Sequence, residues 1–115
     1  MKLLGVMGGD GGAERMWREE GACVINMDYP LRRAAVELYG LSDAEAFGAD
    51  CRVERHGATV ADLVARIEAA VGRGVVRRRI ADLLDVARHS EGVAVLTGLR
   101  DEDRDWLAGI GGKLL

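Results

Sequence analysis

The sequence of 115 residues is long enough for one domain with a hydrophobic core, but it is short for an enzyme that encloses two substrates. Hydrophobic residues make up 49% of the chain and charged residues 30%, with a single proline, which excludes long disordered segments. The net charge of −3 argues against direct nucleic-acid binding, although positive charge is concentrated in the second half.

The sequence also indicates the cellular location of the protein and whether it binds a metal ion. Cys23 and Cys51 are too few for a disulfide framework, and no apolar stretch is long enough to cross a bilayer. The N-terminal residues lack the apolar core of a signal peptide, so we expect a cytoplasmic protein with no membrane partner. His56 and His89 have no partner at metal-ligand spacing, and we expect neither a metal nor a cofactor.

Two apolar strands and a helix are predicted at the start of the chain. The strand Lys2–Met7 is apolar enough to lie inside a parallel sheet covered on both faces. A glycine loop, Gly8–Gly12, leads into a helix at about Ala13–Glu20. The second buried strand is Ala22–Met27, in which we expect Cys23 to be a small core side chain.

Residues that begin and end helices divide the next part. Asp28 stands at an N-cap position and Pro30 in the first helical turn, and Gly40 ends that helix. The residues Ser42–Glu45 form a capping box for a short helix that ends near Phe47.

A polar segment and two further helices follow. Residues 49–58 predict a loop with a brief strand at Cys51–Val53. A helix begins after the N-cap residue Thr59, and its apolar residues recur at helical spacing until Gly72 and Gly74 break the pattern. The next helix carries its apolar residues inward through Val76–Ala87.

The last elements complete an alternation of strands and helices. A strand at Gly92–Gly98 precedes a helix that begins at Asp101, and Gly111–Gly112 end this helix before a short strand at Lys113–Leu115. Such alternation predicts right-handed crossovers and parallel strands. We therefore expect one α/β domain over residues 1–115, a small three-layer parallel sheet flanked by helices.

The glycine loop has the form of a phosphate-binding site. A strand, a glycine loop and a helix present backbone N–H groups to an anion at the helix N-terminus. The candidate loop residues are Gly5, Gly8, Gly9, Asp10, Gly11 and Gly12. A working loop also carries a lysine for the phosphates and a hydroxyl for magnesium, and no frame of this loop supplies them. We therefore assign no catalytic residue.

The charges beside the loop have the wrong sign for a phosphate. Asp10 can cap the helix, and Glu14 adds a second negative charge in its first turn. Arg15 and Arg18 could replace the missing lysine, but pairing with Glu14 and Glu19 is the simpler interpretation. The loop is interpreted as a retained scaffold whose chemistry has been removed.

Two charged clusters are candidates for binding a partner. Their members are Asp101, Glu102, Asp103 and Asp105 in the acidic cluster, and Arg77, Arg78 and Arg79 in the basic one. The acidic cluster would offer a nucleic-acid-like surface to a basic partner. The basic cluster suits a phosphate, a nucleic acid or an acidic protein patch, but its simpler interpretation is a solvated helix face paired with Asp82 and Asp85.

Three stretches together carry a resemblance to a known family. They are Gly5-Val-Met-Gly8, then Asn26-Met-Asp-Tyr-Pro-Leu-Arg-Arg33 with the residues up to Gly48, and Val95-Leu-Thr-Gly-Leu-Arg100 with Gly111-Gly-Lys-Leu-Leu115. In this order they resemble the phage and bacterial deoxynucleoside monophosphate kinases of the P-loop kinase group. The resemblance implies a P-loop kinase-like fold.

The sequence differs from that family at the positions where the family has its phosphate-binding and magnesium-binding residues. The family's Gly-Lys-Asp-Thr becomes Asp10-Gly-Gly-Ala13, and the acidic residue of its Asp-Val-Arg becomes Gly98, while Arg100 is kept. Most of the lid and substrate-binding segments are also missing from this sequence. Because phosphoryl transfer depends on positioning and electrostatic stabilisation, these losses together are expected to remove the activity.

Two hypotheses follow from this pattern. The favoured one is a non-catalytic protein that binds another macromolecule. The resemblance implies a phage-type origin, and the partners would then be host or phage proteins or ribonucleoproteins in the host cytoplasm, such as a CRISPR effector that the protein inhibits. The alternative is a minimal nucleotide-binding protein or deoxynucleoside monophosphate kinase that uses Arg15 or Arg100 in place of the lysine.

Overall fold

The computed structural model describes residues 2–8, 11–87 and 92–115. The chain forms two compact units, of which the first consists of Met1–Met27 and Arg77–Leu115 and the second of Asp28–Val76. The first unit confirms the predicted α/β class, because it holds a parallel sheet flanked by helices.

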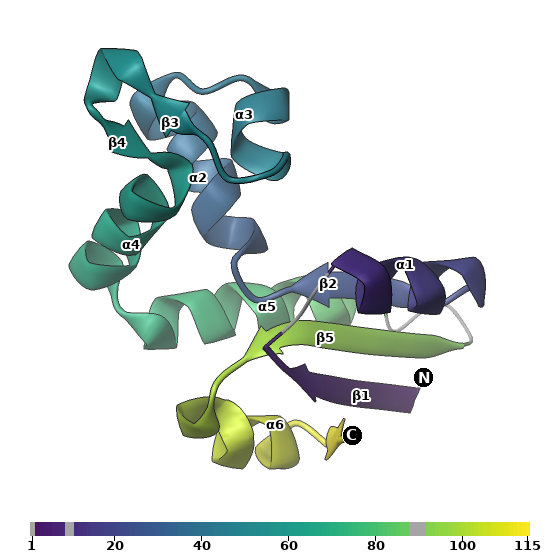
Figure 1. The fold of residues 1–115 in the computed structure, drawn as a ribbon. Coiled ribbons are helices and arrows are strands. Elements are labelled where there is room, and N and C mark those ends of the chain that lie inside the picture. Colours follow the sequence, from purple (N-terminus) through teal and green to yellow (C-terminus); the bar gives the residue numbers. More distant parts are fainter. Residues whose placement is uncertain (1, 9–10, 88–91) are drawn as a thin grey trace. The chain divides into compact units, whose positions relative to one another are not determined.

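A four-stranded parallel sheet forms the centre of the first unit (Figure 1). Its strands are β1 (Lys2–Met7), β2 (Cys23–Asn26), β5 (Val93–Leu99) and β6 (Lys113–Leu114). They are arranged in the order β2-β5-β1-β6, and each neighbouring pair is parallel. β5 therefore pairs on both of its edges, which agrees with its nearly continuous apolar sequence.

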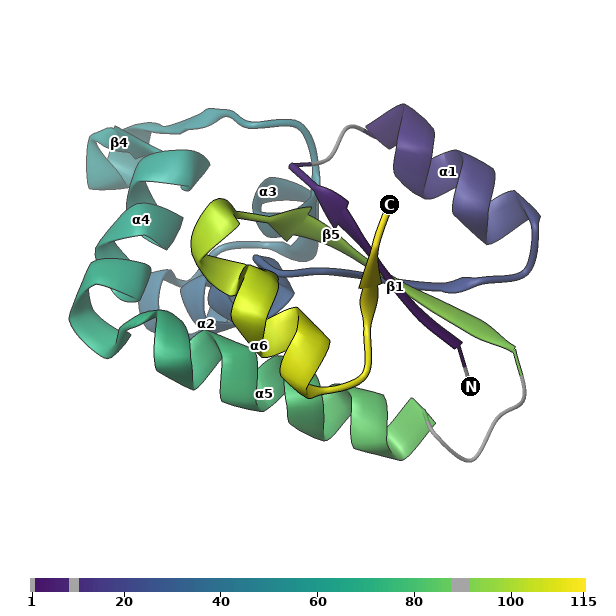
Figure 2. The same ribbon diagram turned by 90° about the horizontal axis from the view of Figure 1, so that it is seen from below.

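Helices lie on both faces of this sheet (Figure 2). α1 (Gly11–Glu19) lies on one face, whereas α6 (Arg104–Gly109) and the part of α5 (Arg73–Ala87) that belongs to this unit lie on the other. The connection from β1 to β2 runs toward one edge of the sheet, whereas the connection from β5 to β6 runs toward the other edge. Connections of the same hand consequently place their helices on opposite faces. A 3-10 turn, η2 (Asp101–Asp103), stands where the sequence predicts the start of the last helix.

Leu107 of α6 packs against the sheet through two glycines. A Cβ atom added to Gly5 would lie 2.5 Å from Leu99 Cδ1 and 2.6 Å from Leu107 Cδ2, and one added to Gly112 would overlap Leu107 as well. The Leu107 residue is only 2% exposed. Gly5 therefore lies inside β1 as a packing residue, because a side chain there would displace the core beneath α6.

The second unit consists of three helices and a small hairpin. Its elements are α2 (Tyr29–Tyr39), α3 (Asp43–Phe47), β3 (Arg52–Val53), η1 (Glu54–His56), β4 (Ala58–Thr59) and α4 (Val60–Val71). α2 contacts both α3 and α4, and its Leu31 and Ala35 are buried together with Leu63 and Ile67 of α4. The predicted brief strand is present as β3, and it pairs with β4, a strand that was not predicted.

Two helices of this unit begin with reciprocal caps. Ser42 Oγ accepts a hydrogen bond of 3.1 Å from the Glu45 N–H, and Glu45 Oε1 accepts one of 2.9 Å from the Ser42 N–H. Thr59 and Asp62 form the same arrangement at the start of α4. Both helix starts are thus set by local sequence. Asp28 occupies the N-cap of α2, but its side chain makes no cap hydrogen bond.

Two sequence predictions are wrong. Gly74 does not interrupt the helix, because α5 begins at Arg73 and continues through it. The cost of about 1 kcal/mol for a glycine in a helix is offset by the burial of Val76 and Ile80 on the same helix. Cys23 is exposed and not in the core, because β2 is an edge strand.

Arg55 holds the carboxylate of Glu45 in a two-point contact. Arg55 Nη1 donates to Glu45 Oε2 at 3.0 Å, and Nη2 donates to Oε1 at 2.9 Å. Hydrogen bonds from Arg55, and then from the Ser42 backbone, lower the pKa of Glu45 from 4.5 to about 2. Because this pKa is lower in the folded state, the carboxylate stabilises the fold above about pH 4.5, and the contribution is lost as the pH falls toward 2.

Glu45→Gln should therefore change the acid stability of the protein. We expect a lower melting temperature at neutral pH than in the wild type, and a smaller further decrease between pH 4.5 and 2, measured by circular dichroism. Glu37→Gln on the exposed side of α2 is the control and should keep the wild-type acid profile. Identical profiles for Glu45→Gln and the wild type would contradict the assigned role of this carboxylate.

Gly5→Ala tests the packing of α6 on β1. The added methyl group overlaps Leu99 and Leu107, so we expect the free energy of unfolding to fall by about 1–3 kcal/mol in urea denaturation. Gly109→Ala, in α6, is the matched control because its Cβ would meet no atom within 4 Å. The control should be neutral or slightly stabilising, and a similar effect of both substitutions would refute the packing role of Gly5.

Candidate functional site

The carboxyl ends of β1, β2 and β5 meet at one edge of the sheet. Gly8 follows β1, Asn26 ends β2, and Thr97 and Gly98 lie near the end of β5. α1 begins after the glycine loop at this edge and supplies Glu14 from its first turn. Ligands of open α/β sheets bind outside the carboxyl ends of the strands, so this edge is the candidate functional site.

Glu14 places its carboxylate against this edge. Its Oε1 accepts a hydrogen bond of 2.7 Å from Thr97 Oγ1 and one of 3.1 Å from Asn26 Nδ2. Thr97 is fully buried, whereas the Glu14 side chain keeps 23% of its exposure. The carboxylate thus connects α1 with β2 and β5, and it takes up side-chain donors that an anionic ligand would otherwise use.

The predicted pairing of Arg18 with Glu14 is confirmed. Arg18 Nη2 lies 4.0 Å from Glu14 Oε2, one helical turn further along α1. The Arg18 side chain is 61% exposed, so this is a surface ion pair with little effect on stability. Arg15 is exposed on the same helix.

The backbone of Gly8 is bonded to β5 on both sides of the residue. Its N–H donates to the Leu99 carbonyl at 2.9 Å, and its carbonyl accepts from the Gly98 N–H. The backbone at Gly8 is left-handed, with φ +60°. The N–H group that directly follows β1 is therefore used within the sheet, and it cannot also donate to a phosphate.

Gly98 also has a left-handed backbone, with φ +74°. A Cβ atom there would lie 3.1 Å from Asn26 Oδ1. A side chain at this position would be strained by the backbone and crowded by Asn26. This conformation gives a structural reason for a glycine at position 98.

The remaining loop residues are placed as follows. Gly5 is buried in β1, and Gly11 and Gly12 form the first turn of α1. Gly9 and Asp10 lie outside the described residues, as does the expected cap by Asp10. In the described residues, the predicted strand is followed by the predicted helix, which begins at Gly11.

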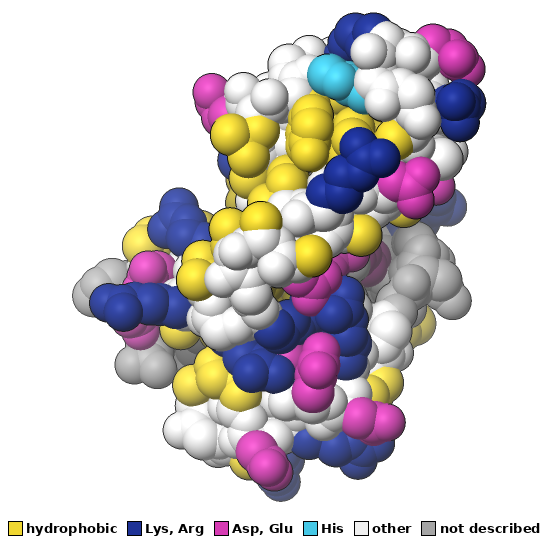
Figure 3. All heavy atoms as spheres, turned by 90° about the vertical axis from the view of Figure 1, so that its left-hand side faces the viewer, with side chains coloured by type: hydrophobic (Ala, Val, Ile, Leu, Met, Phe, Trp, Pro, Cys, Tyr) yellow, Lys and Arg dark blue, Asp and Glu magenta, His cyan; other side chains and the backbone are white. Residues whose placement is uncertain are grey.

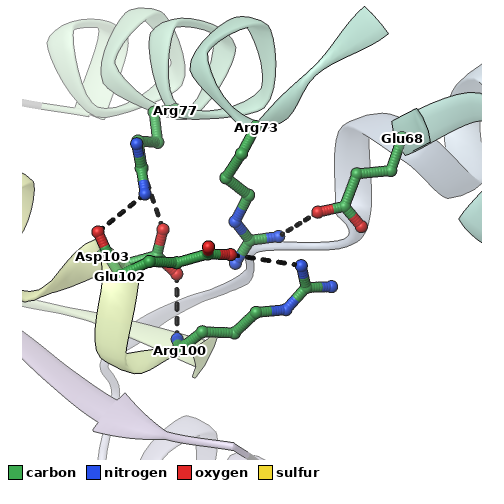
Figure 4. Close-up of polar contacts among 6 residues, drawn as sticks. All are labelled: Glu68, Arg73, Arg77, Arg100, Glu102 and Asp103. Carbon is green, nitrogen blue, oxygen red and sulfur yellow. Dashed lines mark hydrogen bonds and ion pairs between the residues drawn. The ribbon is translucent and has the colours of Figure 1, made fainter. Parts of the chain in front are cut away.

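Asp103 of the acidic cluster is an internal residue (Figure 4). It is fully buried, and its Oδ1 accepts from Arg77 Nε at 2.9 Å while its Oδ2 accepts from the Arg100 N–H at 2.9 Å. Arg77 Nη2 also donates to the Glu102 carbonyl at 2.7 Å. Asp103 and Arg77 thus join α5 to η2. Loss of Arg77 would leave a buried charge without its arginine, and Asp103 presents no charge to a partner.

The other acidic residues lie on the surface. Glu102 Oε1 lies 3.5 Å from Arg100 Nη1, and Asp101 Oδ1 lies 3.0 Å from Arg104 Nε. Asp105 is exposed. Each paired carboxylate therefore has an arginine beside it, which reduces the net negative charge of the cluster.

The arginines of α5 differ in exposure and in hydrogen bonding. Arg78 and Arg79 are exposed on α5, whereas Arg73 of the second unit donates to Glu68 at 3.3 Å (Figure 4). Acidic side chains lie among the Lys and Arg side chains on the face that is shown as spheres (Figure 3). Surface charge is thus available to a partner in both signs.

Other candidate ligands are dispersed. His56 Nε2 lies 2.6 Å from the Tyr39 carbonyl, and Cys23 and Cys51 are both exposed thiols. Among residues 2–8, 11–87 and 92–115, no three His, Cys, Asp or Glu side chains form a group that could hold a metal ion. In the same part of the chain, no helix has both the length and the apolar character needed to cross a membrane.

The sequence did not reveal the partners of Glu14. Thr97 and Asn26 lie 83 and 12 residues away from it, and only the strand order brings them together. A signal was present, because both are polar residues at the carboxyl end of an otherwise apolar predicted strand.

Comparisons with protein-family models, with curated proteins and with solved structures found no match for this chain. The function must therefore be inferred from the residues and the geometry of the candidate site.

Glu14→Ala should destabilise the first unit. The substitution removes the carboxylate that accepts hydrogen bonds from the buried Thr97 hydroxyl and from the Asn26 amide, so we expect the free energy of unfolding to fall by about 1–3 kcal/mol. Urea denaturation measures the change. Glu19→Ala, at an exposed position of the same helix, is the control and should change the stability by less than about 0.5 kcal/mol. Equal effects would show that Glu14 does not hold α1 to the sheet.

Proposed function

We propose that this protein is a non-catalytic binding protein that acts on a macromolecular partner, on a fold related to the P-loop kinases. The succession of β1 and α1 supports that relationship, as does a parallel sheet in which the connection from β1 to β2 and the connection from β5 to β6 run toward opposite edges. In such sheets, ligands bind outside the carboxyl ends of the strands, at the point where the strand order reverses.

The observation that carries this proposal is the carboxylate of Glu14 at the ligand edge. A nucleotide phosphate placed near Thr97 and Asn26 would meet this negative charge, and it would have to replace two hydrogen bonds that Glu14 already receives. Stabilisation of a transferring phosphoryl group instead requires cations at this place. The negative charge of Glu14 at this edge therefore supports a protein that does not transfer a phosphoryl group.

The lysines of the chain do not provide the missing cation. Lys2 and Lys113 are the two lysines in the sequence. Lys2 begins β1, roughly 17 Å from the carboxyl end of that strand at 3.3 Å per residue. Lys113 pairs with Leu4 in the middle of β1. The backbone of neither lysine lies at the carboxyl edge of the sheet.

The partner that we propose is a host or phage protein or ribonucleoprotein. The chain offers exposed carboxylates on η2 and α6, at Asp101, Glu102 and Asp105, and exposed arginines on α5, at Arg78 and Arg79. Charged groups of this kind steer association and select partners more than they add affinity. Inhibition of a defence complex such as a CRISPR effector is the activity that a phage-type origin would imply.

Nucleotide titration tests the proposal against the alternative of a minimal kinase. We expect no binding heat with ATP, dATP or dGMP in magnesium by isothermal titration calorimetry, and no phosphate transfer to dGMP. Micromolar binding together with transfer would overturn the proposal. In that case, Arg100→Gln at the end of β5 should abolish transfer, and the control Arg104→Gln should retain it.

Partner capture from host extract tests the binding surface in the same proteins. Asp101→Asn/Glu102→Gln/Asp105→Asn and Arg78→Gln/Arg79→Gln neutralise the exposed charges and spare the Arg77–Asp103 pair, so both variants should fold. We expect one of them to lose a captured partner that the wild type retains. Equal capture by the wild type and both variants would exclude these clusters as the binding surface.

A further inference from the structure

One exposed face of α5 has an unusual order of side chains. Val75, Arg79, Asp82 and Val86 are all exposed, with 57% exposure at Val75 and 77% at Val86. α5 is one continuous helix from Arg73 to Ala87. At about 100° per residue, these four side chains fall within an arc of about 60°, and their spacing of four, three and four residues forms one stripe along the helix.

This stripe lies apart from the buried side of the same helix. Val76, Ile80 and Leu84 are buried and form the inward face. Arg79 and Asp82 make no hydrogen bond or ion pair within residues 2–8, 11–87 and 92–115. The stripe therefore combines two exposed valines with two charges that other described residues do not neutralise.

We infer that this stripe pairs with the same stripe of a second copy of the chain, in an antiparallel arrangement. Read in either direction, the stripe has an apolar residue at each end and opposite charges in the middle. A two-fold axis beside residues 80 and 81 would place Val75 opposite Val86 of the second copy, and Arg79 opposite Asp82 of the second copy. A self-complementary surface is the requirement for a symmetric dimer.

The order of Arg79 and Asp82 along the stripe is the reason why we infer a second copy of the chain as the partner. The two-fold arrangement forms two identical Arg79–Asp82 pairs, and the valines at the two ends exclude water from them. A parallel arrangement would instead place like charges opposite each other, which is unfavourable. One helix face buries less than the roughly 1,200 Å² of standard interfaces, so the dimer should be reversible and of micromolar or weaker affinity.

Charge reversal tests the dimer directly. We expect the wild type to show a concentration-dependent monomer–dimer equilibrium up to about 1 mM protein in analytical ultracentrifugation. Arg79→Asp and Asp82→Arg each oppose like charges twice in the dimer, so each should raise the dissociation constant about tenfold or more. Arg78→Asp, at an exposed position beside the stripe, is the control and should keep the wild-type constant.

Mixing the two single variants gives a result that misfolding cannot imitate. The Arg79→Asp variant carries two acidic residues on the stripe and the Asp82→Arg variant carries two basic ones, so the mixture should form heterodimers although each protein alone is monomeric. The double variant Arg79→Asp/Asp82→Arg should dimerise like the wild type. A wild type that stays monomeric at about 1 mM, or variants that do not associate when mixed, would overturn the inference. Neither result changes the nucleotide titration, which tests the proposed function separately. Partner capture by the Asp101→Asn/Glu102→Gln/Asp105→Asn variant is also separate, because this variant leaves the stripe unchanged.

Discussion

Glu14 is held at the carboxyl edge of the sheet by a buried hydroxyl and an amide, and this constraint determines what the edge can accept. A carboxylate between Thr97 and Asn26 fixes the start of α1 over β2 and β5. The same contacts place a negative charge at the edge and occupy the donors of Thr97 and Asn26. The succession of β1 and α1 is therefore combined with a carboxylate whose charge opposes a phosphate at this edge.

A buried charge elsewhere in the first unit is also paired with groups of the same unit. Asp103 receives hydrogen bonds from Arg77 and from the Arg100 backbone, so a residue that looks like part of an acidic surface stabilises the junction of α5 and η2. This internal pairing reduces the surface that a partner can contact. It also explains how a short sequence with many charges avoids unpaired buried groups, because no described buried side-chain nitrogen or oxygen lacks a partner.

Local signals predicted most of the elements, and long-range contacts account for what they missed. The strand Lys2–Met7 and the capping box at Ser42–Glu45 were predictable, since apolar runs and cap spacing act over a few residues. Parallel pairing followed from the alternation of strands and helices. The contact between Glu14 and Thr97 was not predictable, because it spans 83 residues and depends on strand order. Gly74 was misjudged because the burial of its helix outweighs its low helical propensity.

The packing of Leu107 against Gly5 affects how the glycine-rich start of this chain can be read in evolutionary terms. Selection for a well-filled interior would keep Gly5 whether or not a nucleotide was ever bound in the lineage. The same holds for Gly98, whose backbone angle few other residues tolerate. Glycines can thus be kept in such a segment for packing and backbone conformation alone. Their number by itself is no evidence of a bound ligand.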